Sequence, residues 1–358
     1  MKSWWIKSQN ASLLLESREA PLPQPGPGEI VVRMRAAALN RGEFNPRYLA
    51  EGSEKIGGHE AAGEVIVRVR AAALNRGEFS LNHHGKGGGE KIGGQEAAGE
   101  VYAVGSGILQ IKTGDRVMGR VRGGFSEFAV MSEAEVIPVP RRLSWEQAAG
   151  VPLVFLVTYD MLIRYGRLQA GEWLLATAVS SGVGVACMQT AHLLGARVIG
   201  TSGSADKLAR LKTCGLDFGI ASRQPDFADQ VKEITGGKGA NVIVNSVGGS
   251  LFGECLRALA YQGRFATVST VDEVTKCEID VAQLHANRWE LFGASNRFTT
   301  TEHRQQAVSG FTRDVLPGFF DGRIVPVVDS VFEFDQLPMA RDRMLGNGQV
   351  GKIILRAP

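Results

Sequence analysis

Several features that would place a chain in a particular class are missing here. No run reaches the about 18 apolar residues needed to cross a membrane, and the start, Met1–Trp5, lacks the apolar core of a secretory signal. The net charge is only +3, without blocks of like charge, so no attraction to nucleic acid or to an acidic membrane is expected. These absences predict a cytoplasmic protein with no nucleic-acid or membrane partner.

Cysteine is scarce as well. The four cysteines all lie in the second half of the chain and show no CxxC spacing: Cys187, Cys214, Cys255 and Cys277. Such a distribution gives no disulfide framework and is typical of a reduced protein of the cytoplasm.

The remaining composition suits a globular protein of two domains. The chain has 358 residues, of which 44% are hydrophobic. Up to about Arg142, short apolar strands are punctuated by Gly and Pro, which predicts a β-barrel-like domain. From Leu143 onward strands alternate with helices, which predicts an α/β domain with a parallel, doubly wound sheet. The expected later elements include a helix over 302–320, a strand over 324–328, a helix over 336–345 and a strand over 352–355.

The barrel-like region contains a duplication. Gly28–Phe44 recurs as Gly63–Phe79 with three differences, and Glu54–Val65 recurs as Glu90–Val101 with His59 replaced by Gln95. One barrel cannot use both copies in the same strand positions, so about 35 residues must be looped out, added at an edge or swapped to another subunit. Copy two leads directly into the strands that follow, which favours copy two as the barrel element and a displaced segment within Arg41–Ala62. A hybrid that uses copy one stays open.

A dinucleotide-binding turn is expected after the first strand of the α/β domain. The apolar segment Trp173–Val179 leads into Ser180-Ser181-Gly182-Val183-Gly184 and then into a helix. A pyrophosphate needs backbone N–H groups at a helix N-terminus, approached without obstruction by a Cβ atom. The glycines remove that obstruction and the serines add hydroxyl donors, so all five residues are candidate cofactor contacts. An ordinary glycine-bearing turn is the alternative.

The tip of the second strand favours NADPH over NADH. NAD enzymes usually place an acid there to hold the ribose 2′-hydroxyl. Here the tip carries hydroxyls and is followed by cations, which suit a 2′-phosphate; the candidates are Thr201, Ser202, Ser204, Lys207 and Arg223. Asp206 lies nearby and is expected to point outward, and a solvated role for Lys207 is the alternative. The ends of the fourth and fifth strands face the same crevice and add Asn245, Ser246, Val247, Gly248 and Ser269.

Motifs along nearly the whole chain resemble the medium-chain dehydrogenase/reductase superfamily, in its zinc-independent quinone oxidoreductase (zeta-crystallin-like) branch. They include Ala38–Gly42 and Ala73–Gly77 (ALNRG), Gly93–Gly99, Gly114–Val117, Ala178–Gly184, Val244–Gly249 and Gly351–Leu355. The resemblance implies a GroES-like catalytic domain from residues 1–149 and 296–358, containing the duplicated segment 28–62 / 63–98. It also implies a Rossmann NADPH-binding domain over 150–295.

The resemblance also implies site residues. The hydrogen-bond donor at the substrate carbonyl is the Asn of Ala-Leu-Asn, which is Asn75 or Asn40, although an Asn that caps a turn is the alternative. Thr158 resembles the Thr beside the nicotinamide, shifted by one place. Tyr159 and Tyr261 are possible proton donors, with buried packing the favoured role for both.

Zinc catalysis is not expected. Zinc-dependent relatives supply a Cys and a Gly-His-Glu motif, whereas this chain has no cysteine before Cys187. His59 therefore lacks a thiolate partner, and the pair His83-His84 is expected to be solvated.

The favoured function is reduction of quinones or α,β-unsaturated carbonyl compounds by hydride from NADPH. A related enoyl or 2-haloacrylate reductase would use the same machinery. An NADPH-binding protein with little turnover is the alternative if the duplication spoils the cleft. A homodimer is expected.

Overall fold

Two units make up the chain, and the computed structural model describes residues 2–9, 12–20, 36–37, 64–74, 90–105, 108, 110–295 and 299–357. The first unit comprises residues 1–153, 300–312 and 326–358, and the second comprises 154–299 and 313–325. The sequence-based borders at 149/150 and 295/296 lie close to two of these boundaries, 153/154 and 299/300. The segment 313–325, however, clusters with the second unit instead of the first.

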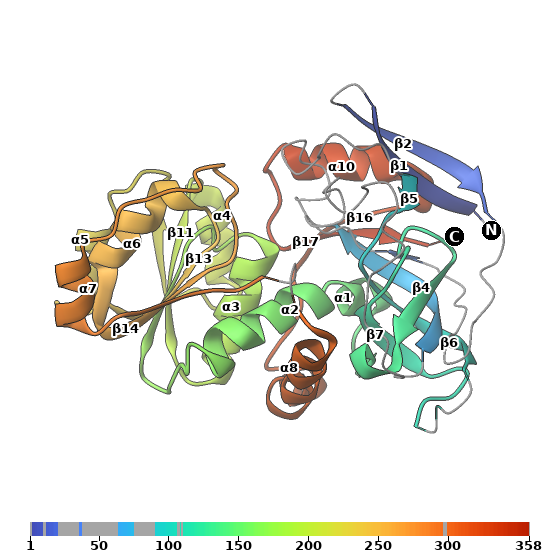
Figure 1. Cartoon of the computed structure of the whole chain (residues 1–358), viewed down its shortest axis with the longest axis horizontal. Helices are drawn as coiled ribbons and strands as arrows, with labels where there is room; N and C mark the ends of the chain where they lie inside the picture. The colour runs from blue at the N-terminus through green and yellow to red at the C-terminus, as the bar shows by residue number, and fades with distance from the viewer. Residues whose placement is uncertain are drawn as a thin grey trace. The chain divides into compact units, whose positions relative to one another are not determined.

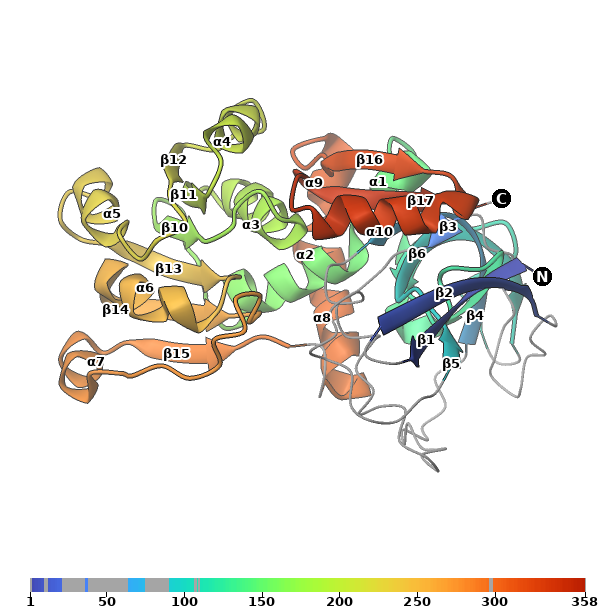
Figure 2. The ribbon, with the colours of Figure 1, turned by 90° about the horizontal axis from the view of Figure 1, so that it is seen from above.

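The second unit is built on a six-stranded parallel sheet with the order β12-β11-β10-β13-β14-β15. When these strands are numbered from 1 to 6 in chain order, starting at β10, the order is 3-2-1-4-5-6, which is typical of dinucleotide-binding folds. Figure 2 shows these strands side by side. The strands are β10 (Trp173–Ala176), β11 (Arg197–Ser202), β12 (Phe218–Ala221), β13 (Ala240–Asn245), β14 (Leu259–Thr267) and β15 (Glu290–Gly293).

Helices connect these strands. Buried residues of α5 and α6 join alternate residues of the strands in one apolar cluster, including Leu175, Ile243 and Phe265. α3 packs on β10 and β11. The helices of this unit are α3 (Gly182–Leu193), α4 (Ala205–Lys212), α5 (Ala228–Ile234), α6 (Phe252–Ala258), α7 (Val281–Asn287) and α9 (Leu316–Asp321), with most of α2 (Pro152–Tyr159) and a π-helical turn, Asp160–Arg164. The expected doubly wound sheet is confirmed.

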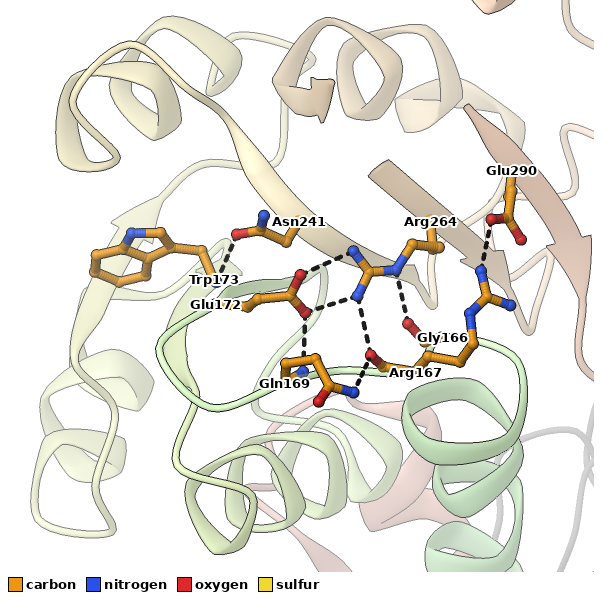
Figure 3. A network of polar contacts seen from close by, with 8 residues as sticks. All are labelled: Gly166, Arg167, Gln169, Glu172, Trp173, Asn241, Arg264 and Glu290. Carbon is orange, nitrogen blue, oxygen red and sulfur yellow. Dashed lines mark hydrogen bonds and ion pairs between the residues drawn. The ribbon is translucent and has the colours of Figure 1, made fainter. Parts of the chain in front are cut away.

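Polar groups at the amino-terminal end of this sheet form a closed network (Figure 3). The Arg264 guanidinium binds both carboxylate oxygens of Glu172 at 3.0 and 2.6 Å and donates to the backbone oxygens of Gly166 and Arg167 at 2.8 and 3.2 Å. At the first residue of β10, the Trp173 N–H donates to Asn241 Oδ1 at 2.9 Å. These contacts tie the starts of β10 and β13 to the middle of β14.

The first unit is mostly β structure. An eight-stranded sheet runs β16-β17-β4-β6-β7-β9, with β3 on β17 and β8 on β4, and a smaller sheet runs β2-β1-β5. The elements are β1 (Lys2–Gln9), β2 (Ser12–Glu19), β3 (Ala36–Ala37), β4 (Glu64–Leu74), β5 (Glu90–Ile92), β6 (Glu96–Val104), β7 (Arg116–Arg120), β8 (Phe128–Ser132), β9 (Ile137–Pro138), β16 (Val328–Phe332), β17 (Lys352–Arg356), α1 (Trp145–Ala149), α10 (Leu337–Leu345) and most of α8 (Thr301–Asp314).

Copy two of the repeat supplies the central strand of the larger sheet. β4 pairs with β6 along one edge and with β8 along the other. Ala36 of copy one and Ala71 of copy two are equivalent in the repeat, and both pair with Arg356 of β17. Copy one therefore adds a short strand beside one end of β17, while the long strand comes from copy two.

A buried ion pair fixes β6 to β17. Glu96, which is fully buried, accepts from Lys352 Nζ at 2.9 Å and from the Leu153 N–H at 2.7 Å. Glu96 lies in the Gly93–Gly99 stretch of copy two, and this stretch is built into the barrel as expected.

Two expected elements near the C-terminus are wrong. The single helix expected over 302–320 is divided into α8 and α9. The division falls before Pro317, because proline has no N–H to donate and its ring clashes with the carbonyl oxygen four residues earlier in a helix. The strand expected over 324–328 lies later, as β16. Pro326 cannot donate to a sheet ladder, so the pairing with β17 begins at Val328.

Candidate functional site: the carboxyl ends of the parallel strands

The order of the sheet places a ligand crevice at the carboxyl ends of β10 and β13. The chain winds to one side from β10 to β11 and β12, and to the other side from β13 onward. Ligands of open α/β sheets bind where this direction reverses. Two loops meet at this point, the turn from β10 into α3 and the loop after β13.

The turn after β10 is tightly held. Ala178 adopts φ +48°, a left-handed conformation that a residue with a Cβ adopts at a cost of about 1 kcal/mol or more. Val179, fully buried, donates its N–H to Thr201 O at 3.0 Å. A Cβ on Gly184 would lie 2.5 Å from Val179 Cα, and one on Gly200 would lie 2.5 Å from Val179 Cγ1. Gly184 and Gly200 therefore both make room for Val179.

The N-terminus of α3 offers donors for an anion. Ser181 caps the helix by accepting from the Gly184 N–H at 3.1 Å. The N–H groups of Gly182 and Val183 lie in the first turn, where no intrahelical acceptor exists. Together with the positive end of the helix dipole, they suit a pyrophosphate. Ser180 is 8% exposed beside them.

The loop after β13 is organised by two fully buried side chains, Thr177 and Asn245. Thr177 Oγ1 donates to Asn245 Oδ1 at 3.1 Å and accepts from the Ser246 N–H at 2.9 Å. Asn245 Oδ1 also accepts from the Val247 and Gly248 N–H groups at 3.0 and 3.3 Å, and Asn245 Nδ2 donates to Gly248 O at 2.8 Å. All the polar atoms of Asn245 are thus used within the protein.

Ser246 differs from its neighbours. The residue is 7% exposed, and its Oγ atom has no hydrogen-bond partner within the described part of the chain. Burial of a hydroxyl without a hydrogen-bond partner lowers the stability of the fold by about 1–3 kcal/mol. A ligand that forms a hydrogen bond with this hydroxyl would recover that free energy.

Gly248 and the segment after β14 complete this side of the crevice. Gly248 has φ +140°, and a Cβ there would collide with the Asp272 carboxylate. That carboxylate accepts from the Ser250 N–H at 2.8 Å and from the Val274 N–H at 3.0 Å. The Asp272 N–H in turn donates to Val247 O at 3.2 Å. Ser269 is half-buried shortly after β14.

The tip of β11 brings hydroxyls and cations together. Thr201 and Ser202 are buried, and Ser204 caps α4 by accepting from the Lys207 N–H at 3.4 Å. The exposed Arg223 side chain lies directly on Gly203, where a Cβ would displace it. Lys207 is half-buried in the first turn of α4, and Asp206 is exposed in the same turn as expected.

The residues near α2 are less accessible. Thr158 is fully buried, with Oγ1 3.5 Å from Cys187 Sγ on α3. Burial raises the pKa of the Cys187 thiol to about 12. Tyr159 donates to Asp314 at 3.1 Å, and burial together with that carboxylate raises its pKa, which disfavours proton release. Tyr261 is 58% exposed, so the expectation that it is buried was wrong.

Asn40 and Asn75 lie outside the described residues, as do His59, His83 and His84. Their roles stay predictions. The described ranges hold no group of three or more His, Cys, Asp or Glu side chains placed to bind a metal ion, and none of the helices found there is long and apolar enough to span a bilayer.

Sequence reasoning missed Thr177 and Asp272. The signal for Thr177 is a hydroxyl directly after an apolar strand, at the position where β10 ends. Asp272 gave no usable signal, because its importance depends on Gly248, which is distant in sequence and meets it only in the fold.

Comparison with known proteins agrees with this architecture. Residues 182–310 match the family model of zinc-binding dehydrogenases, and residues 61–141 match that of the alcohol dehydrogenase GroES-like domain. The second match includes copy two of the repeat and excludes the strand of copy one.

Relatives and solved structures extend the match. Quinone oxidoreductase of Rattus norvegicus is 28% identical over 71% of this chain and 76% of its own. Highly-reducing polyketide synthase 1 of Aureobasidium melanogenum is 31% identical over 63% of this chain, and the match spans only 10% of that synthase. The structure of CurK enoyl reductase superposes with a TM-score of 0.74 at 25% identity, covering 96% of this chain and 95% of that one. A mycobacterial protein complexed with NADPH has the same fold, with a TM-score of 0.76 at 23% identity over 100% of both chains.

Together these matches identify an oxidoreductase fold with a GroES-like and a Rossmann-type part. The chain belongs to the medium-chain dehydrogenase/reductase superfamily, in its quinone oxidoreductase-like branch.

Proposed function

We propose that the protein is an NADPH-dependent, zinc-independent reductase of quinones or α,β-unsaturated carbonyl compounds. The observation that carries the proposal is the convergence of free donor groups at the carboxyl ends of the strands. These groups are the first-turn N–H groups of α3 and the buried Ser246 hydroxyl, which has no partner in the part of the chain that the structure describes. NADPH would supply the hydride when bound.

The tip of β11 supports NADPH over NADH. A 2′-phosphate needs cations and hydroxyl donors and is repelled by a carboxylate. Arg223 lies on Gly203 beside Ser202 and Ser204, while Asp206 is exposed on α4. Lys207, at the start of α4, would add a second cation.

The substrate side is proposed from the family. Hydride transfer to an activated C=C or a quinone needs a donor at the carbonyl oxygen, where negative charge develops. Asn75 is the proposed donor because β4, which directly precedes it, is the strand built into the sheet. Water can supply the proton, so no acid is required. The absence of cysteine before Cys187 supports a reaction without catalytic zinc.

Enoyl reduction is the second candidate, favoured by the similarity to CurK enoyl reductase. Both candidates imply a small-molecule substrate and no role for nucleic acid or membrane. A homodimer in the cytoplasm remains our proposal for the assembly and compartment.

The test combines binding and turnover. Binding of NADPH and NADH is followed by the fluorescence of the reduced nicotinamide, and turnover by loss of its absorbance with quinones, enones and enoyl thioesters. Arg223→Ala should weaken NADPH by about 1.5–3 kcal/mol, the value of a charged hydrogen bond, and leave NADH nearly unchanged. Arg197→Ala is the matched control, because Arg197 stacks on Trp173 at the opposite end of β11.

Three outcomes would contradict the proposal. Equal affinity of the parent protein for both nucleotides would remove the NADPH assignment. If the protein binds NADPH but reduces none of the tested substrates, it is a cofactor-binding protein and not a reductase of these compounds. Stoichiometric zinc that chelators remove together with activity would overturn the metal-free reaction.

A further inference from the structure

Thr177 and Asn245 occupy the point where the direction of the sheet reverses, yet neither can contact a ligand. Both side chains are fully buried. Thr177 uses its hydroxyl as donor to Asn245 Oδ1 and as acceptor from the Ser246 N–H, and both the oxygen and the nitrogen of the Asn245 amide bond to Thr177 or to the loop backbone. These contacts link the end of β10 to every residue of the loop 246–248.

Ser246 Oγ is a buried side-chain atom of this loop, and it has no hydrogen-bond partner among the described residues. Fixing the Ser246 N–H on Thr177 and the Val247 and Gly248 N–H groups on Asn245 also fixes the direction of the Cα–Cβ bond of Ser246. Gly248, with φ +140° and the Asp272 carboxylate where a Cβ would lie, allows the loop a conformation that a residue with a side chain could not adopt here.

The place of the loop indicates which part of a dinucleotide it meets. The pyrophosphate belongs at the N-terminus of α3 and the adenosine ribose at the tip of β11. The nicotinamide half must then extend to the other side of β10, over the end of β13. Ser246 is the first residue after that strand.

We infer that Thr177 and Asn245 are positioning residues that pre-organise the loop 246–248 as the contact surface for the nicotinamide half, with Ser246 as the contacting group. The inference rests on the proposed nicotinamide-dependent function. It changes the role of Asn245 from cofactor contact to support. Pre-organisation improves affinity because the ordering of the loop is complete before binding.

Four variants separate this role from a merely structural one. Thr177→Val removes the hydroxyl at nearly constant volume, and Thr177→Ser retains it. Thr235→Val is the matched control, since Thr235 is also buried and its hydroxyl accepts from the Gly239 N–H at 2.8 Å and donates to Val231 O at 2.8 Å. Thr235 precedes β13, at the amino-terminal end of the sheet. Ser246→Ala removes a hydroxyl that makes no bond within the protein.

The first readout needs no cofactor. Amide hydrogen exchange of residues 246–248 should be about ten-fold faster in Thr177→Val than in the parent, the factor expected for the loss of about 1.4 kcal/mol of hydrogen bonding. Thr177→Ser should restore the parental rates, and Thr235→Val should leave them unchanged. Unaltered exchange in Thr177→Val would overturn the support role.

The second readout compares, for each variant, the change in NADPH affinity with the change in melting temperature. Thr177→Val should weaken NADPH about ten-fold and lower the melting temperature, whereas Thr235→Val should lower only the melting temperature. Ser246→Ala should weaken NADPH without loss of stability. If the parent binds NADPH and Thr177→Val binds it as well as Thr235→Val does, the inference is wrong and the proposed function stands. A parent protein that binds no nicotinamide nucleotide would overturn both.

Discussion

The two ends of the six-stranded sheet use polar residues in opposite ways. At the amino-terminal end, the Arg264 guanidinium makes four hydrogen bonds, two to the Glu172 carboxylate and one each to the backbone oxygens of Gly166 and Arg167 (Figure 3). The polar groups there bond to one another within the protein. At the carboxyl-terminal end, Ser246 Oγ has no partner among the described residues, Arg223 is exposed and Ala178 is left-handed. Satisfied polar groups stabilise a fold, whereas unsatisfied groups and strain are kept where a ligand completes them.

This comparison predicts that damage at the amino-terminal end costs stability and leaves nucleotide affinity intact. Arg264→Ala would leave the Glu172 carboxylate, 21% exposed, without its bidentate partner. We expect a loss of about 3–5 kcal/mol in the free energy of unfolding, measured by chemical denaturation. The folded fraction should bind NADPH as the parent does.

Arg323→Ala is the control, because Arg323 and Asp321 form an exposed pair with 59% and 46% of their side chains accessible. Such pairs contribute about 1 kcal/mol at most. If Arg264→Ala were no worse than this control, the closed network would not be structural.

Two glycines around Val179 test the rigidity of the carboxyl-terminal end. Gly184→Ala places a Cβ against the backbone of Val179, and Gly200→Ala places one against its side chain. Each should cost about 1–3 kcal/mol through overpacking. The second variant Val179→Ala should rescue part of the loss in Gly200→Ala, because it removes both Cγ atoms and leaves the Val179 Cβ at 2.7 Å, and should not rescue Gly184→Ala, whose clash is with the backbone. Rescue of both, observed in thermal melts, would mean that the backbone of this turn can move.

The smallest effect is expected outside the sheet, in the duplicated segment. Deletion of residues 28–62 retains copy two, and deletion of 45–79 yields the same chain except at three strand positions. Shortening a loop by 35 residues changes the closure free energy by only about 0.6 kcal/mol per factor of two in length. Both deletion proteins should therefore fold and differ in stability by less than about 1 kcal/mol.

Nucleotide affinity of the two deletion proteins should match that of the parent, since the groups proposed to bind the nucleotide lie in the second unit and the repeat belongs to the first. Turnover decides whether a single copy suffices for the catalytic site. Loss of nucleotide binding in either deletion protein would show that the two units are not independent in this respect.

The sequence alone predicted the α/β sheet, the turn at Ser180–Gly184 and the copy that forms the long strand. Apolar strands alternating with helices, and direct connection into β6, are local properties of the chain. The break at Pro317 and the shift of β16 past Pro326 could also have been read locally, from the missing N–H group of proline.

Other features depended on tertiary structure. That Gly184 and Gly200 both accommodate Val179, that Arg223 lies on Gly203, and that Thr177 and Asn245 share their hydrogen bonds became visible only in the fold. Each involves residues that are distant in sequence or belong to different strands. Periodicity and motif spacing determine which elements form, whereas packing between elements decides which polar atoms are used within the protein and which are left for a ligand.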